Sequence, residues 1–133
     1  MSQSARIQCN IVSPHGSAVD GQIADITLPA HDGLVGILAD HVPMLCELGV
    51  GVAHYHDENN QLRKIFIDGG FLHVCNNEVL VLTTQALTAD DVNRQKAEAQ
   101  LREAESMPHD NAALRTERQK AMRRAKSLLE LVE

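Results

Sequence analysis

Aromatic side chains are nearly absent from this sequence, which has one tyrosine, two phenylalanines and no tryptophan in 133 residues. A surface that stacks nucleic-acid bases needs several exposed rings, so the composition disfavours a single-strand binder. The formal net charge of −6 argues in the same direction, against nucleic acid and against an anionic lipid surface. The core has to be built from valine, isoleucine, leucine and alanine.

Cysteine is also scarce, and long apolar runs are missing. Cys9, Cys46 and Cys75 are widely spaced and form no C-x-x-C pair, which excludes a zinc knuckle and a dithiol redox motif. No apolar run approaches the roughly 20 residues that span a bilayer, and residues 1–6 lack the apolar region of a signal peptide. We therefore expect a cytosolic protein in a reducing compartment, with membrane contact only through partners.

Catalytic motifs are missing too. The sequence contains no Gly-rich phosphate loop with P-loop spacing and no G-x-S-x-G elbow. We expect a non-catalytic protein without a cofactor or a bound metal.

One alternative rests on the segment His54-Tyr55-His56. Residues i and i+2 of a strand point the same way, so two imidazoles could share a metal ion, as in cupin-type metalloenzymes. His73 is the candidate third ligand. The alternative is therefore a small cupin-like metalloenzyme; exposed or partner-facing histidines are the simpler interpretation.

The predicted fold class is mainly β with α: an N-terminal β-sandwich followed by a C-terminal antiparallel two-helix hairpin. Residues 1–87 contain short alternating apolar runs, beginning with Ile7, Cys9 and Ile11. Many short strands without intervening helices are typical of a sandwich or barrel. Turns are predicted at Pro14-His15-Gly16, Asp20-Gly21, Asp32-Gly33, Asp57-Glu58-Asn59-Asn60, Asp68-Gly69-Gly70 and Asn76-Asn77.

The last long run of the sandwich, Val79-Leu80-Val81-Leu82, is apolar on both faces of the predicted strand. A strand of this kind has a covered outer face. We expect the cover to be either the chain's own tail or a partner.

Residues 88–133 change to helical periodicity. Thr88 with Asp91 indicates a helix start, and Pro108 with Asp110-Asn111 ends the first helix and caps a second. The apolar stripes are rich in alanine, which buries little area, so we expect a hairpin that is weakly held and able to move.

Four segments resemble the epsilon subunit of the bacterial and plastid F-type ATP synthase, in order and in spacing. They are Asn10 to Gly16, Asp32 to Leu45, Leu48 to Gly51, and Ile67 to Phe71, the last with its Gly-Gly-Phe. Ala39-Asp40 departs from the Pro-Gly that this family carries before His41. The tail resembles the family in its layout of two helices.

The resemblance implies a rotor subunit of the central stalk at the cytoplasmic face of the bacterial inner membrane. It implies that the sandwich binds the gamma subunit and the c-ring, and that the loop containing His31, Asp32 and Leu34 lies against the ring. His41 and Pro43 are expected either to contact a partner or to brace their own loop.

The second predicted helix is basic. Residues 111–133 carry six basic and three acidic side chains, whereas residues 1–110 carry six basic and fifteen acidic ones. Two interpretations stay open for the basic residues: a solvated helix face, or contacts with acidic loops of beta subunits that block ATP hydrolysis, as the resemblance implies. The residues concerned are Arg115, Arg118, Arg123 and Arg124.

Some members of the family bind ATP through an I/L-D-x-x-R-A segment. Asp91 and Arg94 match the aspartate and arginine of that segment, while Asp90 and Gln95 replace the flanking apolar residue and the alanine. The resemblance therefore implies only a partial nucleotide-binding motif.

Overall fold

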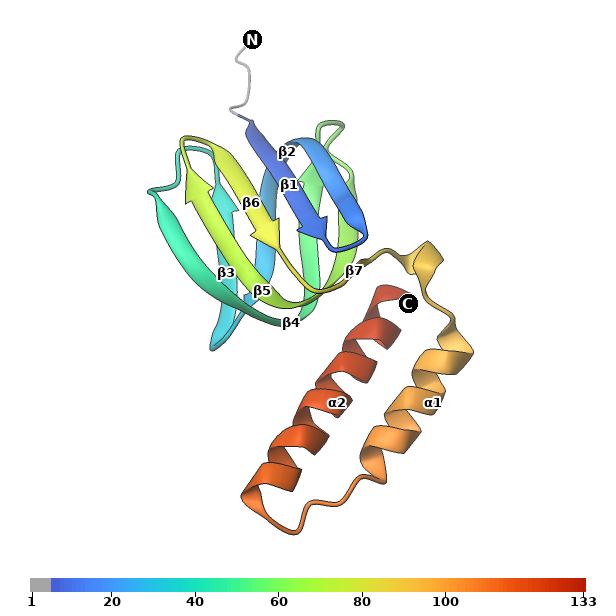
Figure 1. Cartoon of the computed structure of the whole chain (residues 1–133). Coiled ribbons are helices and arrows are strands. Elements are labelled where there is room, and N and C mark those ends of the chain that lie inside the picture. The colour runs from blue at the N-terminus through green and yellow to red at the C-terminus, as the bar shows by residue number, and fades with distance from the viewer. Residues whose placement is uncertain (1–5) are drawn as a thin grey trace.

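The computed structural model describes residues 6–133 and has two parts, a β-sandwich and a helical hairpin (Figure 1). The strands are β1 (Ile7–Ser13), β2 (Gly16–Ala30), β3 (Gly33–Leu38), β4 (Met44–Asp57), β5 (Leu62–Cys75), β6 (Glu78–Leu82) and β7 (Ala86–Leu87). A 3-10 turn, η1 (Ala89–Asp91), leads to α1 (Arg94–Glu105) and α2 (Ala112–Leu131). The predicted fold class is confirmed.

The sheet follows the order β1-β6-β5-β4-β2-β3, and β1 also pairs with β2, which closes the sandwich. The pairings are antiparallel except that of β1 with β6, which is parallel. The core is aliphatic, as the composition predicts, and its large, fully buried side chains include Ile7, Ile11, Ile23, Ile26, Leu28 and Ile65.

Two of the predicted turns are wrong, because both lie inside long strands. Asp20-Gly21 belongs to β2, where Gly21 pairs with Cys9 of β1. Asp68-Gly69-Gly70 belongs to β5, where Gly69 and Gly70 have φ angles of 72° and 111°. Glycine reaches positive φ at no steric cost. Here the two glycines bend the strand instead of reversing it.

The bend in β5 changes which side chains face the core. Before it, the core-facing positions are Ile65 and Ile67; after it, they are Leu72 and Val74. A regular strand keeps one parity, because its side chains alternate strictly. The outward surface of β5 is therefore divided into two different faces, one on each side of the bend.

The predicted helix start at Thr88 is only partly right. The Asp91 carboxylate accepts hydrogen bonds from the backbone and hydroxyl of Thr88, but this capping box closes the 3-10 turn η1. The first α-helix begins at Arg94, because Val92 is extended and Asn93 caps the backbone N–H of Lys96. In α2, Asn111 is the cap, as predicted, and it accepts from Leu114.

Gly70 provides a test of the bend. A Cβ atom at this position would lie 1.8 Å from the carbonyl oxygen of Leu82 on β6. We expect Gly70→Ala to lower the free energy of unfolding by more than about 3 kcal/mol, because the backbone has to shift in addition to the φ strain. Urea denaturation of the purified chain measures the loss.

Gly16→Ala is the matched control for this substitution. Gly16 has a similar φ of 121°, but nothing lies within 4 Å of its added Cβ. We expect a loss of about 1–2 kcal/mol there, from strain alone. Equal losses at the two glycines would contradict the steric explanation.

Candidate functional site

An apolar patch lies on the outer surface of β4, β5 and β6, after the bend. Register places its side chains in two adjacent rows, because Phe71 pairs with both Glu47 and Leu82, and His73 pairs with both Leu45 and Leu80. Leu45 is 72% exposed and Phe71 54%. The outer patch is defined as Leu45, Phe71, Leu80 and Leu82, with Glu47 and His73 beside them.

The outer patch answers the question raised by the doubly apolar run Val79-Leu80-Val81-Leu82. Val79 and Val81 are buried in the core, but Leu80 and Leu82 face outward and are exposed. The hairpin packs elsewhere, on the part of β5 that precedes the bend and on the part of β4 that pairs with it. The tail therefore does not cover this face, and contiguous exposed apolar surface of this kind marks an interaction site.

The segment predicted to face the c-ring forms the turn between β2 and β3. His31 and Asp32 are the two turn residues, since Ala30 pairs with Gly33, and both are exposed. Leu34 follows at 74% exposure. The turn also borders a cleft of about 600 Å³ against β4 and α2.

His41 and Pro43 lie in the connection from β3 to β4. The Nδ1–H of His41 donates to the carbonyl oxygen of Val42 at 2.7 Å, which is a bond within the loop. Asp40, in the place of the family's glycine, has a φ of 64° and pairs with the side chain of Asn77. The loop is thus braced from the β5–β6 turn.

The hairpin rests on the sandwich through the end of α2 (Figure 1). Leu128 and Leu131 pack on Val52 and Phe66, and Ala97 of α1 completes the cluster. Phe66 is fully buried although it faces away from the sandwich core. Burial of each large side chain contributes about 1.5–3 kcal/mol. The docked end of the hairpin is thus leucine-rich, in contrast to the alanine-rich stripe emphasised by the sequence.

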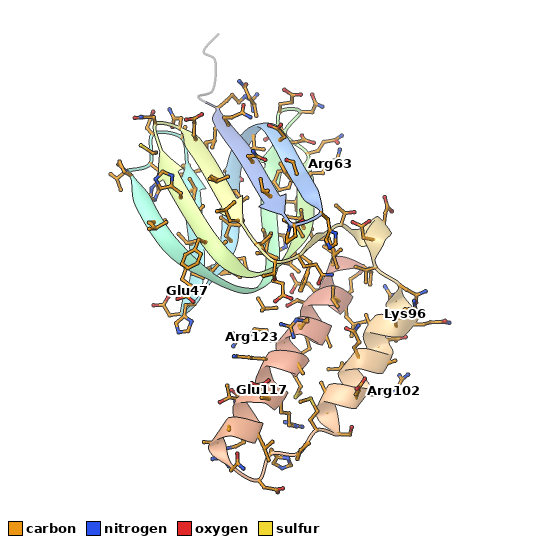
Figure 2. The ribbon with its side chains drawn as sticks, in the orientation of Figure 1. Glu47, Arg63, Lys96, Arg102, Glu117 and Arg123 are labelled. Atoms are coloured by element: carbon orange, nitrogen blue, oxygen red, sulfur yellow. The ribbon has the colours of Figure 1, made fainter. Side chains whose placement is uncertain are left out.

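Three of the four arginines singled out on α2 are engaged within the chain. Arg115 donates to the carbonyl of His109, and Arg118 donates to that of Glu105, so both brace the turn between the helices. Arg124 forms two hydrogen bonds of 3.0 Å with the Asp68 carboxylate. This carboxylate is the main reason why the pKa of Arg124 is raised. Arg123 is exposed and projects from α2 (Figure 2).

Asp91 and Arg94, the partial nucleotide motif, are also engaged. Asp91 holds Thr88, as described, and Arg94 donates to the carbonyl oxygen of Val132 at 2.9 Å. This contact ties the start of α1 to the end of α2.

The three histidines of the metalloenzyme alternative do not come together. His56 pairs with Asp25 at 2.9 Å, and His54 lies 3.7 Å from Glu130. His73 lies in the outer patch, nine residues along β5 from Lys64, the partner of His54, and on the other side of the bend. Across residues 6–133, no three His, Cys, Asp or Glu side chains are placed to hold one metal ion.

Sequence reasoning missed the outer patch and the pairing of Arg124 with Asp68. The double-faced run at Val79–Leu82 was the signal for the patch, but Leu45 and Phe71 join it only through strand register. The ion pair joins residues 56 positions apart, and its acid lies in a segment predicted to be a turn.

Residues 6–89 match the model of the ATP synthase delta/epsilon chain β-sandwich domain. An ATP synthase epsilon chain from Synechococcus is 38% identical over 79% of this chain and 74% of its own length. One from Rhodopirellula baltica is 32% identical over 92% and 95%. Neither favours a cupin-like enzyme.

A solved structure extends the similarity in fold to the hairpin. A chain in the Euglena gracilis mitochondrial ATP synthase superposes with a TM-score of 0.84 at 22% identity, covering 100% of this chain and 85% of that one. Among residues 6–133, no helix is long and apolar enough to cross a bilayer.

Proposed function

The chain belongs to the delta/epsilon family of ATP synthase, and from this premise we propose that it is the non-catalytic epsilon subunit of the rotor. The match of the family model to residues 6–89 carries the proposal. In this role the subunit couples ion flow through a membrane ring to ATP synthesis. It is a peripheral component at the cytoplasmic face of the bacterial inner membrane, held there by other subunits.

The outer patch is the proposed seat of the gamma subunit. Large apolar side chains surrounded by polar ones are typical of the centre of a protein–protein interface. The patch lies on three paired strands of the sandwich, so it is a rigid surface. A rigid surface suits a subunit that transmits torque. It also favours binding, because little free energy is lost in ordering its side chains when the partner binds.

The turn at His31 and Asp32, together with Leu34, is the proposed contact with the c-ring. These residues project from a two-strand hairpin and are exposed. The contact requires no buried group of the sandwich to move.

The hairpin, residues 88–133, is the proposed regulatory part. Its contact with the sandwich is confined to the end of α2, where few large side chains are buried. When extended toward the catalytic head, α2 presents Arg115, Arg118, Arg123 and Arg124 to acidic surfaces of the beta subunits and restrains hydrolysis. Nucleotide binding at Asp91 and Arg94 is not part of the proposal.

Phe71→Glu tests the gamma seat. We expect this change to weaken gamma binding at least tenfold, since a charge replaces an apolar centre. Stability should change within about 0.5 kcal/mol, because Phe71 is exposed. Leu62→Glu is the matched control: Leu62 is 59% exposed on the same strand before the bend. Titration calorimetry with purified gamma that gives equal affinities for both variants would remove the patch from the interface.

The double variant Asp32→Lys, Leu34→Trp tests the ring contact. Both side chains are exposed, so folding should survive with a change of about 0.5 kcal/mol or less. We expect lower ATP synthesis per unit of proton gradient in membrane vesicles that carry the variant complex. Unchanged coupling would show that the turn does not contact the ring.

Truncation after Leu87 tests the regulatory role. The main core consists only of strand residues, so the fragment should fold and bind gamma, although Val52 and Phe66 become exposed. In the assembled complex we expect a higher rate of ATP hydrolysis and little change in synthesis. A hydrolysis rate equal to that of the full chain would exclude a brake in the hairpin.

A further inference from the structure

The pairing of Arg124 with Asp68 is the best-formed charged contact between the hairpin and the sandwich. Nε and Nη2 of Arg124 each lie 3.0 Å from a different oxygen of the carboxylate. The Asp68 side chain is 17% exposed and that of Arg124 41%, so the pair is half-buried and water screens it less than a fully exposed pair. Two single contacts lie near the end of α2: His54 is 3.7 Å from the Glu130 carboxylate, and the Lys64 ammonium donates to the Glu130 carbonyl oxygen at 3.2 Å.

Asp68 is held rigidly at the bend of β5. Its backbone N–H donates to the carbonyl of Gln85 and to the hydroxyl of Thr83, at 3.1 and 3.2 Å. Its carbonyl oxygen accepts from the Thr84 hydroxyl at 2.8 Å. A carboxylate on a backbone fixed in this way offers a guanidinium few bidentate geometries, so it favours one position of α2.

The apolar contacts of the hairpin do not provide that selection. Leu128 and Leu131 pack on Phe66 through apolar contacts, which are non-directional and fix the rotation of a helix less strictly than hydrogen bonds do. A bidentate ion pair loses both hydrogen bonds when the helix shifts by a fraction of a turn. The pair therefore distinguishes the docked hairpin from loosely attached alternatives.

We propose that Arg124 and Asp68 form a latch that holds the hairpin in its docked position. Release of the hairpin frees Arg124 to bind an acidic surface. The same guanidinium therefore binds Asp68 in the docked state and a partner carboxylate in the extended state. This consequence for hydrolysis rests on the regulatory role proposed above. The latch itself is a property of the isolated chain and is tested without any partner.

A thiol introduced by Ser127→Cys reports release of the hairpin. Ser127 is 8% exposed and lies in the cleft between α2 and β4, and cysteine is close to serine in size. Cys46→Ser and Cys75→Ser complete the reporter chain. Cys9 stays as an internal control, because burial raises the pKa of its thiol to about 12 and it reacts only on unfolding. The rate of alkylation at position 127 then measures the released population.

Asp68→Asn and Arg124→Gln are each expected to raise that rate severalfold, since a half-buried charge loses its bidentate partner. The two changes together should add little beyond either one. Exchanging the charges, with Asp68→Arg and Arg124→Asp, should recover part of the protection. Lys120→Gln is the matched control, because it removes one positive charge from an exposed position of α2 outside the cleft that Ser127 lines, and it should leave the rate unchanged.

The latch is refuted if Arg124→Gln reacts no faster than Lys120→Gln. It is also refuted if mass spectrometry finds Cys9 modified as fast as position 127, because the rate then measures global unfolding. If truncation raises ATP hydrolysis but the Arg124 and Asp68 variants do not release the hairpin, the proposed function stands and only the latch is refuted. If the variants release the hairpin but truncation leaves ATP hydrolysis unchanged, only the regulatory role is overturned.

Discussion

The bend of β5 at Asp68-Gly69-Gly70 is the constraint on which the rest of the structure depends. Because core-facing positions change parity there, one strand presents two outward faces, the outer patch after the bend and the hairpin seat around Phe66 before it. Gly70 lies so close to the Leu82 carbonyl that no side chain fits. The same bend fixes the Asp68 carboxylate opposite α2. The positions of both surfaces thus follow from a local feature of the backbone.

The two faces differ in how they are covered. The hairpin seat is covered by the chain itself, through a small cluster of large side chains and the ion pair of Arg124. The outer patch is covered by nothing among residues 6–133, and its apolar side chains stay exposed. This difference supports a permanent partner on the outer patch and a hairpin that can detach from its seat around Phe66. Under the proposed function, the sandwich stays bound to its partner while the hairpin is released.

Local features were predictable from the sequence, and long-range pairings were not. Alternation identified β1 around Cys9, and the Asn111 cap identified the start of α2. The Gly69-Gly70 pair was predicted to reverse the chain, because positive φ serves turns and bends alike. The ion pair and the two rows of the outer patch depend on register, which one sequence does not reveal. The same limit applies to His54 and His73. The sequence left a shared metal site open, whereas the fold places the two histidines far apart along the sheet.

Hydroxyl-radical footprinting of side chains, with and without purified gamma, tests the division into two faces most directly. The account predicts that gamma protects Leu45, Phe71 and His73 from oxidation, while Leu62, on the same strand before the bend, stays as reactive as in the free chain. Protection of Leu62 with the outer patch still reactive would contradict the account, because gamma would then bind the face that the structure assigns to the hairpin side.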